Sequence, residues 1–108
     1  MGPQILDPLQ QAADDVVSTW PGVKAKNVFG LRGYVRDGHL FGFMAYSGVS
    51  ARAATKEAAE ALYASGAATP FMYNGSMEMR GWPVRPLSSD ADLDAVLEAL
   101  HEAYQAAT

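Results

Sequence analysis

The chain lacks several features that would assign it to a functional class directly. None of its 108 residues is cysteine, so disulfides, thiolate nucleophiles and cysteine-based zinc sites are excluded. The two histidines, His39 and His101, are far apart in the sequence, and neither has a second ligand at a metal-binding spacing. No serine–histidine–aspartate arrangement and no phosphate-binding loop can be identified. We therefore expect no metal, no cofactor and no catalytic residues, and interpret the chain as a non-enzymatic protein.

Long hydrophobic segments are also missing. The longest strongly apolar run covers residues 40–46, which is too short to span a bilayer. The first ten residues, MGPQILDPLQ, contain no basic segment followed by a long apolar run, so no signal peptide is visible. Together with the absence of cysteine, these features predict a cytoplasmic protein without membrane contact.

Basic residues are missing from both ends of the chain. All eight Lys and Arg residues lie between Lys24 and Arg85, together with four acidic residues, and the other eight acidic residues lie in the two ends. The net charge is −4. This distribution is compatible with an ordinary solvated surface, and it also leaves open a basic face that meets an acidic partner.

The length and composition of the chain indicate one folded domain over residues 1–108, because 49% of the residues are hydrophobic and 19% are charged. Asp7-Pro8 has the pattern of a helix N-cap followed by proline, and apolar residues then recur at helical spacing over residues 8–20. A second helix is expected between Thr55, as its cap, and Gly66, as its terminating glycine. Ser88 or Ser89 opens a third helix, with acidic residues in its first turn.

Strands are expected between these helices, and three turn signals divide them. Asp37-Gly38 and Asn74-Gly75 are typical of two-residue hairpin turns, and Ser47-Gly48 is a weaker turn signal. The predicted strands cover residues 28–36, 39–46, 49–53, 71–73 and 77–84. The fold class is therefore α+β, with the order α-β(3)-α-β(2)-α and a single antiparallel five-stranded sheet that carries its helices mainly on one face.

Alternation along these strands predicts a contact surface. Side chains on a strand point alternately to its two faces, and basic and aromatic residues gather on the face expected to lie away from the helices. This predicted interaction face consists of Arg32, Tyr34, Arg36, Arg52, Arg80 and Trp82. The strand over residues 39–46 is apolar on both sides, which predicts a central strand that is covered twice. Since the helices cover one side, the other needs a second helix layer or another subunit, and for this reason we expect a homodimer or a protein partner.

The stretch Arg80-Gly81-Trp82 admits two interpretations. In the first it is structural, with Trp82 at a sheet edge and Arg80 paired with Glu78 or Glu57. In the second it is part of a protein contact surface, because Trp and Arg are common interface anchors. A nucleic-acid interface on the same face is a less favoured alternative because the chain is acidic overall. A small-molecule site is the third alternative.

Four short motifs, taken in order, resemble the TfoX/Sxy N-terminal domain family. They are Phe29-Gly30, the Asp37-Gly38 hairpin, Arg52 at a strand end, and Met79-Arg80-Gly81-Trp82, within a region of roughly residues 24–100. Val28 stands where the family usually has Met, and Ser76-Met77-Glu78 stands where it usually has Arg-Pro. The resemblance implies a secretion-chaperone-like fold and a stand-alone domain without the helical C-terminal domain of the competence regulators. It supplies no catalytic residues and does not imply control of competence genes. The two-sided apolar strand beside the Arg/aromatic face, and not the resemblance, predicts a protein-interaction or regulatory module.

Overall fold

The computed structural model describes residues 4–46 and 48–107, which form three helices and one antiparallel sheet of six strands. In chain order the elements are α1 (Pro8–Val17), β1 (Val23–Val28), β2 (Leu31–Arg36), β3 (His39–Ala45), β4 (Gly48–Ala51), α2 (Lys56–Ser65), β5 (Thr69–Tyr73), β6 (Met77–Pro86) and α3 (Asp90–Ala106). The strands lie side by side in the order β1-β2-β3-β4-β6-β5. The predicted α+β class with an antiparallel sheet is confirmed, and the prediction of five strands is wrong. Ser47, from the predicted Ser47-Gly48 turn, lies outside the described residues.

The additional strand arises from a turn that the sequence conceals. Residues 28–36 were expected to form one strand, but Phe29 and Gly30 form a tight turn between β1 and β2, with φ angles of 56° and 78°. A bulky residue such as Phe is uncommon at positive φ, so Phe29-Gly30 does not carry the usual Asn-Gly or Asp-Gly signature. The side-chain oxygen of Asn27 accepts a hydrogen bond from the Gly30 amide at 3.1 Å and stabilises the turn.

The helix ends follow the sequence signals closely. Asp7 caps α1 in a reciprocal capping box with Gln10, and Thr55 caps α2. Gly66 ends α2 in the left-handed conformation, and Ser89 caps α3. The first helix ends earlier than the predicted residue 20, because the chain turns at Ser18 before it enters β1.

A β-bulge in β3 decides which side chains face the helices. Tyr34 pairs with Gly42 and Val35 pairs with Leu40, so Phe41 is an extra residue without a partner on β2. Phe41 and Met44 therefore join the cluster below α1 and α3, whereas Phe43 belongs to the cluster on the opposite face. The prediction that this strand is apolar on both sides is confirmed. Because of the bulge, however, Phe41 and Phe43 face opposite sides of the sheet, although residues two apart on a regular strand share a face.

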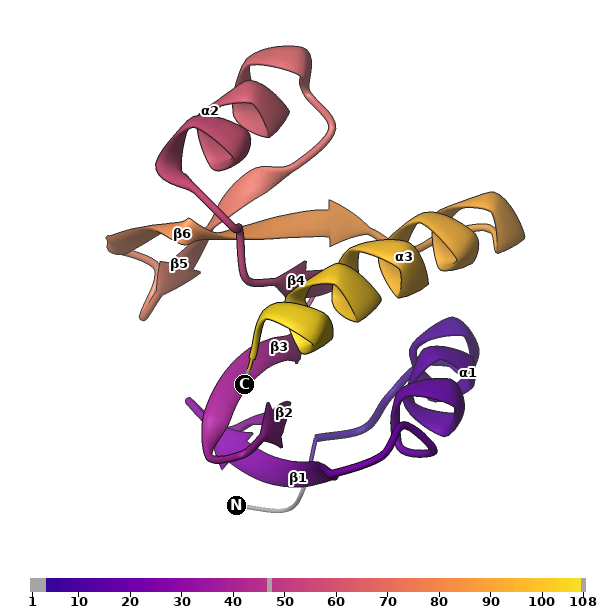
Figure 1. Ribbon diagram of the computed structural model, residues 1–108. Coiled ribbons are helices and arrows are strands. Elements are labelled where there is room, and N and C mark those ends of the chain that lie inside the picture. Colours follow the sequence, from indigo (N-terminus) through magenta and orange to yellow (C-terminus); the bar gives the residue numbers. More distant parts are fainter. Residues whose placement is uncertain (1–3, 47, 108) are drawn as a thin grey trace.

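Helices α1 and α3 lie beside each other across one face of the β1–β4 part of the sheet, and α2 lies apart from them over β5 and β6 (Figure 1). The cluster under α1 and α3 contains Tyr34, Phe41 and Val49 from the sheet, with Val17 and Leu100 from the two helices. Burying each such side chain contributes roughly 1.5–3 kcal/mol, so this helical layer supplies much of the stability.

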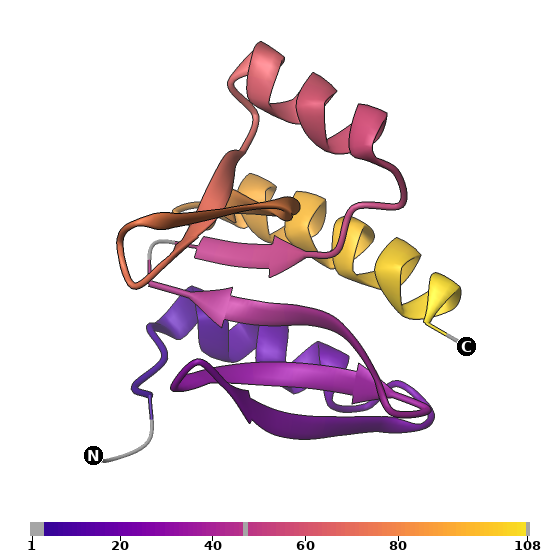
Figure 2. The ribbon, with the colours of Figure 1, turned by 90° about the vertical axis from the view of Figure 1, so that its left-hand side faces the viewer.

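The opposite face of the sheet is covered by the chain itself. In Figure 2 the strands lie in front of α1 and α3, and this face is turned toward the viewer. The sheet curls so that Phe29 at the β1–β2 turn stacks on Phe71 and Tyr73 of β5, with ring centroids 5.9 Å and 4.8 Å apart. Phe43 lies at the centre, and its ring is 4.8 Å from that of Phe71. This face of β3 is therefore buried within the chain, and the homodimer or protein partner remains a prediction without this argument.

Close packing of α3 on β3 depends on Gly42. A Cβ atom at this position would lie 2.4 Å from a methyl carbon of Leu100 and 3.0 Å from the backbone oxygen of Ser50. Any side chain would therefore push α3 away from the sheet.

We expect Gly42→Ala to lower the free energy of unfolding by about 1–3 kcal/mol, because it overpacks this contact. Urea denaturation measures the change, and Gly81→Ala is the matched control because a Cβ atom there meets no atom within 4 Å. In a Leu100→Ala background the Gly42→Ala change should cost less. Equal effects of the two glycine substitutions would contradict the proposed contact.

Candidate functional site

Arg80-Gly81-Trp82 forms a bulge in β6. Pro70 of β5 pairs with Pro83, and the next residue, Phe71, pairs with Met79, so these three residues have no partner on β5. The backbone oxygen of Gly81 instead accepts a hydrogen bond from the Ala53 amide, beyond the end of β4, at 3.1 Å. The bulge therefore interrupts the β5–β6 pairing, and after it β6 pairs with β5 at Pro83 and Val84 and with β4 from Val84 onward.

The Arg80 side chain joins the bulge to α2. Its guanidinium donates two hydrogen bonds to the Glu60 carboxylate, at 2.6 Å and 2.7 Å, and forms an ion pair with Glu78. It also lies 4.9 Å from the ring centroid of Tyr63, whose hydroxyl donates to the Arg80 backbone oxygen at 2.7 Å. The hydrogen bonds that Arg80 donates to Glu60 lower the pKa of the Glu60 carboxyl group and raise the pKa of the Arg80 guanidinium. The expected pairing with Glu78 is present, and Glu60 takes the place expected for Glu57.

Trp82 belongs to the aromatic cluster on the second face of the sheet. It is half-buried, and its ring centroid lies 5.4 Å from that of Phe43. Buried Ser50 lies in the same region, between Phe43 and Val84 in the strand pairing, and its hydroxyl has no hydrogen-bond partner among the described residues. These contacts favour the structural interpretation of the Arg80-Gly81-Trp82 stretch.

Three residues of the predicted interaction face lie on the helix-covered side of the sheet instead. The Tyr34 side chain is fully buried, and its hydroxyl donates to the Asp14 carboxylate of α1 at 2.6 Å. Arg32 pairs with the same carboxylate at 2.5 Å. Arg36 donates to the backbone oxygen of Tyr104 in α3 and lies 4.2 Å from that ring centroid. The predicted faces of residues 28–36 are therefore reversed. The helices were expected on the side of Leu31, but they cover the side of Tyr34.

The Asp14–Arg32–Tyr34 cluster fastens α1 to β2. The hydrogen bond to Asp14 is the main reason that the pKa of Arg32 is raised, and burial is the main reason that the pKa of Tyr34 is raised. Both donors, one charged and one neutral, bind the Oδ1 atom of the buried Asp14 carboxylate. The arrangement therefore explains how α1 docks on β2.

The predicted interaction face is consequently not one surface. Tyr34 is buried under the helices, and Arg32 and Arg36 pair with groups on α1 and α3. Trp82 packs in the second cluster, and Arg80 binds α2. Arg52 is exposed just after β4, and among the described residues it forms no ion pair and donates no side-chain hydrogen bond. The structure does not bring these six side chains together.

The histidines do not form a metal site. His101 packs against Trp20 and Tyr104, with ring centroids 5.1 Å and 5.7 Å away, and His39 is exposed at the start of β3. In the part of the chain that the structure describes, no three His, Cys, Asp or Glu side chains are grouped so that they could hold a metal ion.

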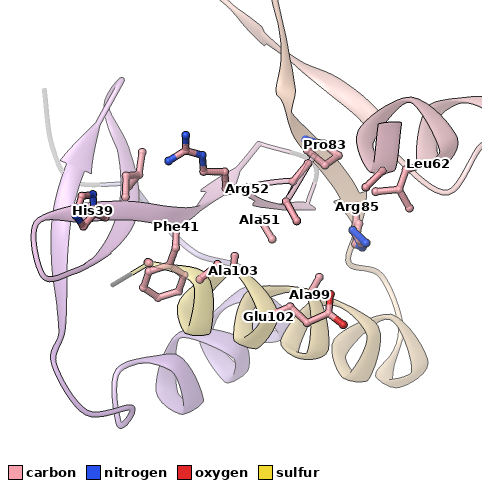
Figure 3. A pocket seen from close by; sticks show the side chains of 16 residues that line it. His39, Phe41, Ala51, Arg52, Leu62, Pro83, Arg85, Ala99, Glu102 and Ala103 are labelled. Carbon is pink, nitrogen blue, oxygen red and sulfur yellow. The ribbon is translucent and has the colours of Figure 1, made fainter. Parts of the chain in front are cut away.

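A groove lies between α2 and α3 (Figure 3). Its volume is about 470 Å³, within the usual range for ligand sites. Ala51 of β4 and Pro83 of β6 belong to its floor, and Ala58 and Leu62 of α2 line one wall. The wall formed by α3 consists of Ala99, Glu102, Ala103 and Ala106. The remaining lining residues are His39, Leu40, Phe41, Arg52, Ala53, Ala54, Arg85 and Ala107.

Most lining residues are apolar in type, and the four with polar or charged side chains are His39, Arg52, Arg85 and Glu102. Figure 3 shows His39 and Arg52 toward one end of the groove and Arg85 near Leu62 toward the other. Arg85 is half-buried and, like Arg52, forms no ion pair within residues 4–46 and 48–107. The lining contains no serine, threonine, tyrosine or lysine, so it holds no hydroxyl or amine nucleophile.

Sequence reasoning did not identify this groove. Its walls are alanines on two helices that are separated by β5 and β6 in the chain. Alanine is a strong helix former and indicates nothing about a cavity. The available signal was that Ala99, Ala103 and Ala106 recur at helical spacing on one side of α3, where larger residues would be expected if α2 packed against it.

We expect Arg80→Gln to increase amide hydrogen exchange throughout α2, because the substitution removes the ion pairs that fasten this helix to β6. Exchange in α1 should not change. Arg32→Gln is the matched control and should have the opposite pattern, with faster exchange in α1 only. Unchanged exchange in α2 of the Arg80→Gln protein would contradict the anchoring role.

Alkaline pH should destabilise the protein through Tyr34. Its pKa is raised in the folded state, so the stabilisation is complete below the unfolded-state pKa of about 10 and is lost as pH rises above that value. The free energy of unfolding should fall by up to about 1.4 kcal/mol per pH unit for this one proton. In Tyr34→Phe the fall should be shallower, as measured by urea denaturation from pH 7 to 11. The same slope in both proteins would contradict this assignment.

Comparisons with known proteins do not assign the site. No protein-family model matches the chain, and no curated protein matches its sequence. Within the described residues, no helix is both long and apolar enough to cross a membrane. The functional interpretation therefore depends on the chemistry of the groove itself.

Proposed function

We propose that this chain is a small non-enzymatic protein-interaction module, and that the groove between α2 and α3 is its contact surface. The supporting observation is an open groove of about 470 Å³ in which half of the lining residues are alanine and the two arginines have no ion-pair partner in the described part of the chain. This keeps the function expected from the sequence and changes the surface, since the predicted interaction face is divided among internal contacts. A cytoplasmic location and a regulatory role are part of the same proposal.

We also infer that the chain is a TfoX/Sxy N-terminal-like domain with a secretion-chaperone-like fold. Three of the four motifs that carry the resemblance occupy positions with special backbone geometry. Phe29-Gly30 and Asp37-Gly38 are turns with positive φ, and Arg80-Gly81-Trp82 is the β6 bulge. Residues at such positions constrain the backbone, so the motifs support a shared fold more than a shared partner.

A nucleic-acid interface has less support from the positions of these side chains than from the sequence pattern. That alternative required arginines and aromatic rings to lie together on an open sheet face, where bases could stack. Tyr34 is buried, Trp82 packs against Phe43, and Arg80 and Arg32 are paired with carboxylates. We therefore retain it as an outcome of the experiment that follows.

The test is an affinity capture from native cell extract with variants that fill the groove. Ala58 is exposed and lines the groove, whereas Ala61 is exposed on the same helix and does not line it. We expect wild type and Ala61→Trp to retain the same protein and Ala58→Trp to lose it, with equal thermal stability of both variants. Equal capture by all three would refute the groove as the contact surface. Retention of a nucleic acid that dissociates steeply with salt would favour the alternative instead.

A further inference from the structure

The floor of the groove offers no free strand edge. β4 pairs with β3 on one side and with β6 on the other. Where β6 forms the floor, Pro83 and Val84 pair with Pro70 and Thr69 of β5. A bound segment therefore cannot extend the sheet there, and its affinity must come from side-chain contacts.

The side chains of the lining are mainly apolar, since twelve of its sixteen residues are alanine, leucine, phenylalanine or proline. Without a free strand edge, the floor offers no ladder of hydrogen bonds to an extended backbone. A helix satisfies its backbone groups internally, because each amide bonds to the carbonyl four residues earlier.

The α3 wall is suited to the close approach of a helix. Ala99, Ala103 and Ala106 are spaced at i, i+4 and i+7 and face the groove, and Ala58 does so from the α2 wall. Small side chains allow helix axes to approach toward the lower end of the usual separation of about 8–10 Å.

The charges of the lining favour an acidic partner. Arg52 and Arg85 carry two positive charges near different ends of the groove, and Glu102 carries one negative charge on the α3 wall. Arg85 is half-buried without an ion-pair partner among the described residues, so a carboxylate that reaches it gains a charge-assisted hydrogen bond.

We propose that the partner segment is an amphipathic helix whose apolar stripe lies in the groove and whose flanking carboxylates pair with Arg52 and Arg85. This inference rests on the proposed function and specifies the class of partner. It excludes strand addition and basic segments, and it is independent of the partner's identity.

The test uses synthetic peptides of about five helical turns with a leucine and alanine stripe at helical spacing. One peptide carries Glu beside the stripe, a second carries Lys at the same positions, and a third carries Glu and two central prolines that prevent a helix. We expect the helical Glu peptide to bind most tightly in fluorescence anisotropy, to shift the amide resonances of groove residues and to weaken with salt. Arg85→Gln should weaken its binding about tenfold, as expected for loss of one charge-assisted bond.

Two variants separate the groove from charge in general. Ala106→Trp, which fills the groove, should abolish binding, whereas Ala95→Trp, on an exposed part of α3 outside the lining, should not. Equal binding of the Glu and Lys peptides, or tighter binding of the proline peptide, would overturn the proposed partner class. These peptide results would not affect the capture experiment with the Ala58→Trp protein. The class of partner and the groove as contact surface are therefore tested independently. Binding of dodecanoate with Arg85 dependence, and of neither helical peptide, would assign the groove to an anionic small molecule and overturn the helix.

Discussion

The burial of β3 on both faces is the constraint on which the rest of this structure depends. Phe41 and Met44 point toward α1 and α3, and Phe43 and Ala45 point toward the second cluster. The bulge at Phe41 shifts the alternation by one residue, so it decides which of these side chains face the helices. The first face takes the two terminal helices, and the second is closed when the sheet curls and Phe29 reaches β5. A small domain thus obtains two apolar clusters from one sheet, without a second subunit.

The arginines that resemble a surface motif in the sequence mainly form ion pairs that attach helices to the sheet. Asp14 holds Arg32 and Tyr34 and fixes α1 on β2, and Glu60 holds Arg80 and fixes α2 on β6. Each helix is thereby attached to a different part of the curled sheet. Exposed ion pairs contribute little to global stability, but they set where a short, alanine-rich helix lies.

The separation of α2 from α3 produces the groove. α3 packs over β3 and β4 through Leu100 above Gly42, and α2 is tied to the far end of β6 through Arg80. The alanines between them are too small to fill the space, and Arg85 is left beside it without an ion-pair partner in the described residues. The groove is therefore a consequence of how the helices are fastened, which explains why it has no signature of its own.

The sequence by itself determined the local structure. Caps at Asp7, Thr55 and Ser89, the turn glycines and the apolar periodicity predict the three helices, most of the strands and the two-sided central strand, because these signals act over a few residues. It did not determine which face of the sheet each side chain occupies. A single bulged residue or a turn such as Phe29-Gly30, stabilised by rings forty residues away, reverses that assignment. The helix-facing position of Tyr34, the internal pairing of Arg80 and the groove itself were decided only by tertiary packing, since each depends on contacts between distant segments.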